Sequence, residues 1–503
     1  MKKIVPKLKK IRLTHLFKIG HLSREIIFAI LCCCFIGLTI LLIPIGIRFD
    51  FSRNQAYSLS GATKKIIQKL DKPVSLTFYV TSELPTRLIP LKTEVIDLLN
   101  EYKKINNSKI AVTVVDPKKD PKKEAEIKQL GLPELQFSQL EQDKYQVTNA
   151  YFGLGITYQD KKEIIPQLTD VSNIEYNITS LIYRMTKKEF EKIGIIGVPQ
   201  SADPQNDSYY AFKTVLFQQY EIAPLTIETT EETPIDKNNK LLIIIDDSAT
   251  TYDEVQLSKL KKYAEDGGKI IFFIDGVKVN ESLQTSSSSA NLSGLLRDFG
   301  IHLEPNLVLS SSAEYVNFGN SVFQYLTPYP FWVKSTDFNT KTGYFANISQ
   351  LTFPWTSSVT PIKVPGVATE VLAATSKQSW EQRGTFELNP QNIPQPLTKN
   401  VKSFALVAQS AIGKKGTVVV VPTSRFVDGK YLSRTSGNIE FAFNMIDNLA
   451  SSGALSGIRS RATTFQPLPE LPQSQKELFK YVNILLLPGL LALYGTIRIM
   501  KRK

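Results

Sequence analysis

The stretch LLIIIDDSATTYD, residues 241–253, decides how the larger part of this chain is expected to fold. An unbroken apolar run leads directly into two acids, Asp246 and Asp247, and a polar turn follows. Continuous apolar strands are typical of parallel sheets that are covered on both faces. In such sheets, ligands bind beyond the carboxyl ends of the strands. The two acids therefore belong either to a catalytic site or only to the skeleton of the fold.

Apolar strands and helices alternate on both sides of this stretch. Further strands are expected at KIGIIGV, EIAPLTIE and KIIFFID, residues 192–198, 221–228 and 269–275. The alternation predicts a parallel sheet with helices on both faces. We expect this flavodoxin-like unit to cover residues 188–462, with a less regular insertion at about 310–400, where Ser, Thr, Pro and aromatic residues are frequent.

A first α/β unit is expected before it, over residues 48–187. The sequence predicts a strand at VSLTFYV, a helix over about 90–104, a strand at KIAVTVV, a further helix, and a hairpin that turns near Gln159. This order is similar to a thioredoxin-like sheet. The redox motif of that fold is absent, because the only cysteines are Cys32, Cys33 and Cys34.

The net charge of +13 is concentrated at the two ends of the chain. Residues 1–25 and the C-terminal end are strongly basic, which leaves the long middle nearly neutral. A nucleic-acid-binding domain carries its basic residues on the folded part. Nucleic acid is therefore not expected as a partner.

Each basic end adjoins an apolar run. Residues 26–47 carry no charge and are long enough to cross a bilayer as a helix. A second membrane helix is expected over 479–498, after a Pro-rich spacer at 463–478. Because basic residues mark the cytoplasmic side, the tails 1–25 and 499–503 are expected in the cytoplasm and the α/β units outside it. A cleaved signal peptide is the alternative for the first run, but no A-x-A-like site follows it.

Three acids at strand ends are the candidate ligand or rim residues: Asp246, Asp247 and Asp275. Carboxylates at adjacent strand ends can bind Mg²⁺ or a sugar, or form an acid–base pair. The alternative is that they cap the following helix, and Asp247 with Ser248 stands before a helical pattern. We expect the capping role, and hence no catalytic residue, no metal site and no cofactor.

Five passages, in chain order, resemble one known family. They are YSLSGATKKIIQKLDKPVSLTFYVTSELP, LLNEYKKINNSKIAVTVVDP, LLIIIDDSATTYDEVQLSKLKKYAEDGGKIIFFIDG, LLRDFGIHLEPNLVLS and YVNILLLPGLLALYGTIRIMKRK. Together they spread over residues 48–503. On these passages the chain resembles the GldG-type auxiliary proteins of bacterial ABC transport systems, a family first associated with gliding motility.

The resemblance implies a subunit of the bacterial cytoplasmic membrane whose large domains are periplasmic. Such a subunit works with a separate permease and a separate ATPase. This chain departs from the fused forms, since it has two expected spans and no six-helix permease domain. It also has no Walker A sequence, so it is not the motor.

The second unit is also similar to class I glutamine-amidotransferase-like domains, which use a cysteine on a strand-to-helix elbow and a histidine. Outside residues 1–47 this chain has no cysteine and a single histidine, His302, which is not at an elbow. No G-x-S-x-G motif replaces the cysteine. Nucleophilic catalysis of this type is therefore excluded.

The function expected from these observations is that of a non-enzymatic auxiliary subunit. It docks on an ABC permease and contacts the substrate or envelope components, either polysaccharide or protein. Two alternatives stay open: a carboxylate-dependent hydrolase of an envelope polymer that uses Asp246 and Asp247, and a structural envelope scaffold.

The second expected membrane helix carries a series of small residues. Gly489, Ala492 and Gly495 recur every third position, which keeps them roughly along one face of a helix. Small residues let membrane helices approach each other closely. We expect this face to pack on a permease helix; the alternative is a simple anchor with a kink at Pro488.

Overall fold

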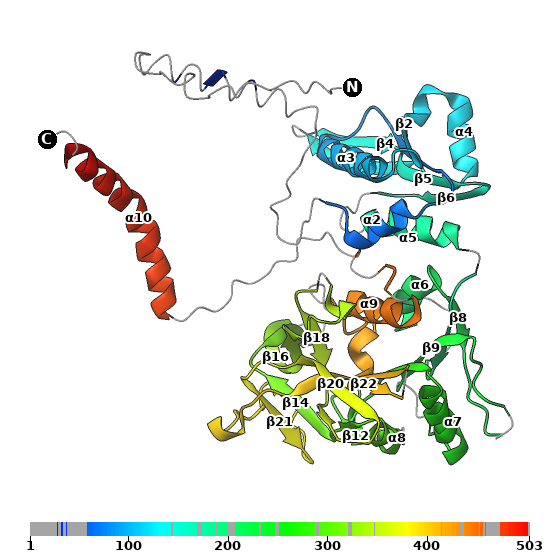
Figure 1. Ribbon diagram of the computed structural model, residues 1–503, viewed down its shortest axis with the longest axis vertical. Helices are drawn as coiled ribbons and strands as arrows, with labels where there is room; N and C mark the ends of the chain where they lie inside the picture. The colour runs from blue at the N-terminus through cyan, green and yellow to red at the C-terminus, as the bar shows by residue number, and fades with distance from the viewer. Residues whose placement is uncertain are drawn as a thin grey trace, which may run out of the picture. The chain divides into compact units, whose positions relative to one another are not determined.

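The computed structural model (Figure 1) describes most of residues 58–458 and all of 473–500. Short gaps interrupt the first range at 142–143, 169–173, 188, 199–206, 231–232, 247–250, 288–290, 320–323, 347, 414, 433–436, 452 and 456–457. The basic tail 1–25, nearly all of the expected first membrane helix 26–47, most of the spacer 463–478 and the end of the tail 499–503 lie outside the described residues. The chain divides into two compact units, Met1–Ser58 and Leu59–Lys503, and the following concerns the second.

A four-stranded mixed sheet forms the N-terminal part of this unit, in the order β2-β1-β5-β6. Strand β1 (Val74–Val80) pairs in parallel with β2 (Ile110–Val115) through the connecting helix α3 (Ile89–Ile105), and β5 (Phe152–Tyr158) forms an antiparallel hairpin with β6 (Lys161–Ile165). Buried and half-buried residues alternate along β1, as expected for a strand with one face in the core. The helices of this part are α2 (Gly61–Gln68), α4 (Pro121–Gln129) and α5 (Ile174–Thr186).

A second hairpin in this part was not expected from the sequence. Strands β3 (Leu135–Glu141) and β4 (Lys144–Ala150) pair with each other in an antiparallel register. Their sequence, LQFSQLEQDKYQVTNA, is rich in Gln and charged residues. Apolar and polar residues alternate only briefly, at Leu135 and Phe137 and again at Tyr145 and Val147, which is a weak strand signal.

The large sheet has eight strands in the order β17-β20-β22-β23-β10-β9-β7-β8. Its parallel strands are β7 (Lys192–Ile196), β8 (Glu221–Pro224), β9 (Asn239–Ile245), β10 (Lys269–Phe273) and β23 (Gly416–Val421). Numbered along the chain, these five lie in the order 2-1-3-4-5, which is the strand order of flavodoxin. Its first and third strands, β7 and β9, flank the point where the order reverses.

The expected parallel sheet is present, but the whole sheet is mixed, because three strands on one side of it run antiparallel. Strands β22 (Ala405–Ile412), β20 (Val367–Ala374) and β17 (Asp337–Phe338) run antiparallel to their neighbours. The connection from β22 to β23 is only residues 413–415. A parallel pair needs a crossover of a dozen or more residues, so this short connection imposes a hairpin.

Helices cover both faces of the large sheet. In Figure 1, α6 (Tyr210–Phe217) and α9 (Asn438–Ser451) lie above it, and α7 (Glu254–Glu265) and α8 (Ser293–Asp298) lie below it. Alternate residues of β9 enter the two cores: Ile243 packs with α6 and α9, and Leu242 and Ile244 pack with α7 and α8. Because side chains alternate across a strand, burial on both faces explains the unbroken apolar run of β9.

The segment expected to be less regular is built of antiparallel strands. Strand β14 (Asn306–Ser310) pairs with β21 (Ser379–Arg383), and β15 (Ala313–Gly319), β16 (Gln324–Ser335) and β18 (Leu351–Pro354) form a three-stranded sheet. The remaining short strands are β11 (Val277–Val279), β12 (Thr285–Ser287), β13 (Ile301–Leu303) and β19 (Val359–Pro361). The tryptophans Trp332, Trp355 and Trp380 pack within the aromatic cluster of this segment. The aromatic residues of the segment therefore form a small core.

Helix α10 (Gln473–Met500) is the one helix of the described residues that is long and apolar enough to cross a membrane. Pro488 lies inside it. Large apolar side chains such as Leu490 and Ile497 are exposed along it.

Candidate functional site

The carboxyl ends of the parallel strands bring together polar residues from three strands. Asp246 directly follows β9, Asp275 follows β10, and Ser424 follows β23. All three side chains are buried. Asp246 and Asp275, two of the three candidate ligand or rim residues, lie at these strand ends, and Asp247 lies outside the described residues. A ligand-binding role for them stays a prediction.

The switch point between β7 and β9 is tightly closed. Gly197, just after β7, has φ 84°, a conformation that glycine adopts easily and other residues do not. A Cβ at this position would collide with the backbone carbonyl oxygen of Ile245, the last residue of β9. The two strand ends therefore approach each other as closely as a bare backbone allows.

Asp275 is held by Ser424 through two hydrogen bonds. The Ser424 backbone N–H donates to Oδ1 at 2.9 Å, and the Ser424 hydroxyl donates to Oδ2 at 2.6 Å. Burial raises the pKa of Asp275 to about 6, the bonds from Ser424 oppose this rise, and the nearby charge of Asp246 adds to it. Asp275 therefore takes up a proton near neutral pH more readily than an ordinary aspartate.

Asp246 is paired with a lysine from the next short strand. The Nζ of Lys278, on β11, lies 2.8 Å from Oδ1 of Asp246, whose side chain is 1% exposed. The backbone N–H of Asp246 donates to the carbonyl oxygen of Phe273 at 2.9 Å. The pKa of Tyr252 is raised to about 12 by burial and by the charge of Asp246. The first acid after β9 is thus an internal ion-pair partner.

A second ion pair follows Ser424 along the chain. Nη1 of Arg425 lies 3.2 Å from Oδ2 of Asp428, whose side chain is fully buried. The guanidinium of Arg425 also lies over the ring of Tyr431, 5.3 Å from its centroid. The Tyr431 ring contacts Trp355 and Trp332, with centroids 5.1 and 6.1 Å apart. This contact joins the aromatic cluster of the antiparallel segment to the carboxyl edge, by which we mean the carboxyl ends of the parallel strands with Asp246, Asp275 and Ser424.

The arrangement matches each of these buried carboxylates with a donor from the same chain. Among the described residues, no group of three or more His, Cys, Asp or Glu side chains has the arrangement of a metal site. His302 lies on β13 beside Arg297 and Glu304. The chemistry that the edge offers is proton uptake by Asp275 and charge pairing, within a largely buried network.

Sequence reasoning missed Ser424, Arg425, Asp428 and Lys278. The first three stand in GTVVVVPTSRFVDG, residues 416–429, where an apolar strand leads into a polar run just as at β9. That repetition was a usable signal. No sequence signal pointed to Lys278, because its ion pair with Asp246 depends on how β11 returns to the end of β9.

Helix α7 shows which residue caps it. Asp253 accepts a hydrogen bond from the backbone N–H of Gln256 at 2.7 Å, and Gln256 accepts one from the backbone N–H of Asp253 at 3.0 Å. This reciprocal pair is a capping box. The cap of α7 is therefore Asp253, several residues after the expected Asp247 and Ser248.

The small residues of α10 are at the surface of that helix. A Cβ added at Gly489 or Gly495 would meet nothing within 4 Å, and Ala492 is exposed. Packing of Gly489, Ala492 and Gly495 on a permease helix stays a prediction.

Known proteins are similar to this chain in sequence over nearly its whole length, and in structure over about half of it. An uncharacterized protein of Borreliella burgdorferi (strain ATCC 35210 / DSM 4680 / CIP 102532 / B31) is 21% identical over 96% of this chain and 97% of its own length. Among solved structures, the mmIFT52 N-terminal domain is 15% identical over 51% of this chain and 97% of that chain, with a TM-score of 0.35. A putative ThuA-like protein from Bacteroides uniformis is 14% identical over 54% and 97%, with a TM-score of 0.30. Structural likeness at this level supports no functional conclusion.

Two family models match the sequence. A domain of unknown function matches residues 53–157. The model described as an ABC-type uncharacterized transport system matches residues 191–445, which is half of the chain and contains the whole carboxyl edge described above. The protein therefore belongs to the auxiliary family of ABC-type uncharacterized transport systems.

Proposed function

We propose that the protein is a non-enzymatic, membrane-anchored auxiliary subunit that docks on a separate ABC permease and ATPase. Its extracytoplasmic domains contact the transported substrate or an envelope polysaccharide or protein. Membership of the ABC auxiliary family carries this proposal.

The proposed fold assignment is a thioredoxin-like α/β domain over residues 48–187 and a flavodoxin-like, amidotransferase-like α/β domain over residues 188–462. The first rests on the parallel β1–α3–β2 unit joined to the β5–β6 hairpin. The second rests on the order of the five parallel strands. Both would serve as binding scaffolds, since the sequence has no cysteine after Cys34.

The burial and the internal contacts of the acids at the carboxyl edge support a non-enzymatic role. Over the whole residue, Asp246 is 5% exposed and Asp275 is 6% exposed. Both carboxylates already contact groups of the same protein, Lys278 and Ser424. A general acid or base needs direct or water-mediated reach to its substrate. Carboxylates buried in internal contacts do not offer that reach, whereas a scaffold gains rigidity from them.

The proposed topology has two membrane helices and both termini in the cytoplasm. Helix α10 has the length and composition of a span, and Arg498 lies in its last turn. The apolar run 26–47 next to the basic residues 1–25 supplies the second span.

Affinity purification of the full chain in mild detergent tests the proposal. We expect an ABC permease and an ATPase to co-purify in fixed ratio with the tagged protein. Absence of both from a complex that retains other envelope proteins would favour the scaffold alternative. The same purification from cells that lack the permease gene is the matched control.

A hydrolase acting on an envelope polymer is the second candidate. The raised pKa of Asp275 next to Asp246 favours it, because a general acid near neutral pH needs such a shift. Substitution of Asp246→Asn with Asp247→Asn, and separately Asp275→Asn, distinguishes the two functions. The hydrolase predicts lost turnover of cell-wall polymer with intact folding, and the auxiliary role predicts unchanged co-purification.

A further inference from the structure

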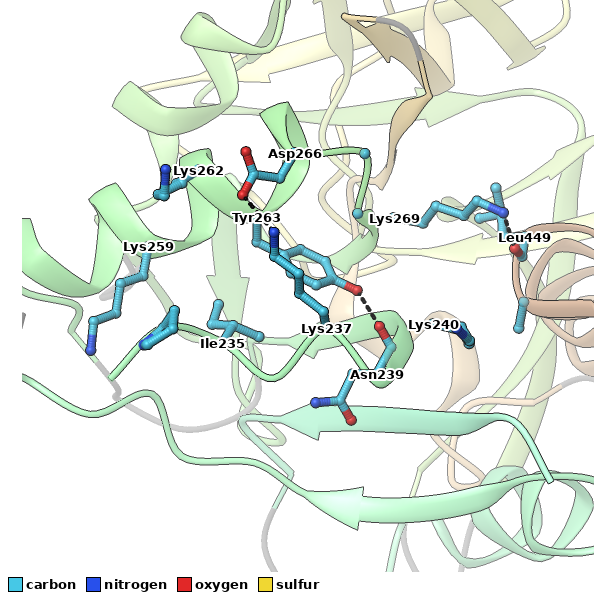
Figure 2. Close-up of a pocket in the computed structure, with 14 residues that line it drawn as sticks. Ile235, Lys237, Asn239, Lys240, Lys259, Lys262, Tyr263, Asp266, Lys269 and Leu449 are labelled. Atoms are coloured by element: carbon cyan, nitrogen blue, oxygen red, sulfur yellow. Dashed lines mark hydrogen bonds and ion pairs between the residues drawn. The ribbon is translucent and has the colours of Figure 1, made fainter. Parts of the chain in front are cut away.

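A basic pocket (Figure 2) lies at the amino ends of β9 and β10, whereas Asp246 and Asp275 follow the carboxyl ends of the same strands. A cavity of about 270 Å³ is lined by the start of β9, the end of α7 and the end of α9. Figure 2 shows the ring of Tyr263 in its centre, with the Tyr263 hydroxyl bonded to the carbonyl oxygen of Asn239 at 2.8 Å. The floor of the pocket is thus partly aromatic.

Lysines dominate the lining of this pocket. They are Lys237, Lys240, Lys259, Lys262 and Lys269, and Asp266 is the one acid among the lining residues. Like charges around one cavity repel each other. A bound anion would relieve that repulsion.

Three of the five ammonium groups already have partners in the protein. Lys237 lies 3.3 Å from Asp266, but its side chain is 80% exposed, so this pair contributes little. Lys259 donates to the carbonyl oxygens of Glu228 and Thr230 at 2.9 and 2.5 Å. Lys269 donates to the carbonyl oxygen of Leu449, and burial lowers the pKa of Lys269.

The other two lysines are available. Within the described part of the chain, the ammonium groups of Lys240 and Lys262 make no hydrogen bond or ion pair with a protein group, and both side chains are exposed. Lys240 is the one exposed residue of β9, whose other residues are all buried. A lysine in that position is not required by the sheet.

Helix ends account for only part of this cluster. Cations stabilise helix C-termini. This explains Lys262, which lies in the last turn of α7, and Lys269, the first residue of β10, whose ammonium reaches the Leu449 carbonyl oxygen near the end of α9. Lys240 lies on a strand, and Lys237 precedes that strand. Their convergence on the same cavity needs another reason.

We propose that this lysine pocket binds a phosphate group, carried either by a lipid headgroup or by a soluble phosphorylated molecule. Phosphate carries up to two negative charges and several acceptor oxygens, and lysine binds it as a point charge. The cavity is slightly smaller than the ~300 Å³ at which drug-sized sites begin, which suits a headgroup-sized ligand. The proposal does not depend on the docking proposed above.

The connection to α10 makes a lipid source reachable. Ala450 lines the pocket, and α10 begins at Gln473. At about 3.5 Å per residue the intervening chain spans at most roughly 80 Å. A bilayer that holds α10 is therefore within tethered reach of the pocket.

The test uses the full chain in neutral detergent and isothermal titration calorimetry with two probes. The first probe is inorganic pyrophosphate, and the second is dihexanoyl phosphatidic acid below its micellar concentration. The pocket variant is Lys240→Gln with Lys262→Gln. The matched control is Lys363→Gln with Lys377→Gln, which removes the same charge from two exposed lysines outside the pocket.

We expect the wild type to bind at least one probe, the pocket variant to bind it tenfold more weakly or worse, and the control to bind as the wild type does. Binding of both probes means that the phosphate itself is recognised, and binding of phosphatidic acid alone identifies a headgroup site. Lys240→Arg with Lys262→Arg should restore most of the affinity. No binding by the wild type, or equal weakening in the pocket and control variants, would overturn the proposal.

Discussion

The Ser424 hydroxyl donates to Oδ2 of Asp275 at 2.6 Å while the Ser424 backbone N–H donates to Oδ1 at 2.9 Å. This pair ties the end of β10 to the end of β23, two neighbouring parallel strands. It also holds a buried carboxylate whose pKa is raised to about 6. The stability of the protein should therefore depend on pH in a way that one substitution can remove.

We expect Asp275→Asn to stabilise the protein above pH 7. The native carboxyl has a pKa of about 6 against 3.8 for the unfolded chain, so the native state binds more protons between these values. Stability then falls as pH rises from about 4 to about 6, and the full cost at pH 7 is on the order of 3 kcal/mol. Asn keeps both contacts with Ser424, because its amide donates to the hydroxyl.

Urea unfolding of wild type and Asp275→Asn at pH 4.5 and pH 8 measures this effect. The variant should gain stability at pH 8 and little at pH 4.5. A parallel pH dependence in both proteins would show that Asp275 does not titrate as described. Ser424→Ala serves as control, since it should destabilise the protein by about 1–3 kcal/mol, more at pH 8 than at pH 4.5.

We expect Lys278→Ala to destabilise the protein by about 3 kcal/mol or more. The change removes the ammonium partner of Asp246, a carboxylate that is 1% exposed, and a buried charge that loses its partner is costly. The double variant Lys278→Met with Asp246→Asn should regain most of this loss. A double-mutant cycle of Lys278→Met, Asp246→Asn and their combination, measured by urea unfolding, gives the coupling. A coupling near zero would contradict the buried ion pair.

Loss of the α7 cap should have a smaller effect. Asp253→Ala removes one half of the capping box with Gln256, which costs about 1 kcal/mol. Asp253→Asn keeps an acceptor oxygen and should be close to the wild type. Thermal unfolding of the two variants separates the hydrogen bond from the charge, and equal losses in both would assign the effect to the charge.

The small-residue face of α10 can be tested through the complex. Gly489, Ala492 and Gly495 replaced together by leucine should reduce co-purification of the permease, because bulky side chains keep helices apart. Leu490→Ala with Ile497→Ala changes the opposite face and is the control. Wild-type yield from the triple variant would mean that α10 is only an anchor and that coupling passes through the extracytoplasmic domains.

The proposed topology predicts protection of the tails. Protease added to intact spheroplasts should cut within the α/β units and leave epitope tags at both ends of the chain uncut, because basic flanks stay in the cytoplasm. Permeabilised cells, in which the tags become accessible, are the control. Digestion of either tag in intact spheroplasts would contradict the two-pass arrangement.

Strong periodic signals made the larger part of the fold predictable. The apolar runs of β9 and β10, with a helical pattern between them, predicted a covered parallel sheet. The order of these elements along the chain placed Asp246 and Asp275 at the carboxyl ends of neighbouring strands. The direction of β22 was missed because strand patterns do not encode direction; the short link at 413–415 does.

The partners of the site acids were beyond the reach of the sequence. Ser424 is 149 positions from Asp275 along the chain, and Lys278 reaches Asp246 from a short strand with no periodic pattern. Such pairs depend on tertiary packing.

The cap of α7 was predictable from the D-x-x-Q spacing of Asp253 and Gln256. It was missed because Asp247 and Ser248 stand closer to the end of the preceding strand and were assigned the capping role.

The aromatic contact between Tyr431 and Trp355 gives the protein a built-in optical probe. The whole chain contains three tryptophans, and Trp332, Trp355 and Trp380 all lie in the antiparallel segment beside the carboxyl edge. Intrinsic fluorescence of the intact protein is therefore a local signal rather than an average over the chain. Through Tyr431 and Arg425, two of these indoles are linked by contact to the residue that follows Ser424. Emission of the purified protein, excited at the indole band, should therefore report events at this edge without any label.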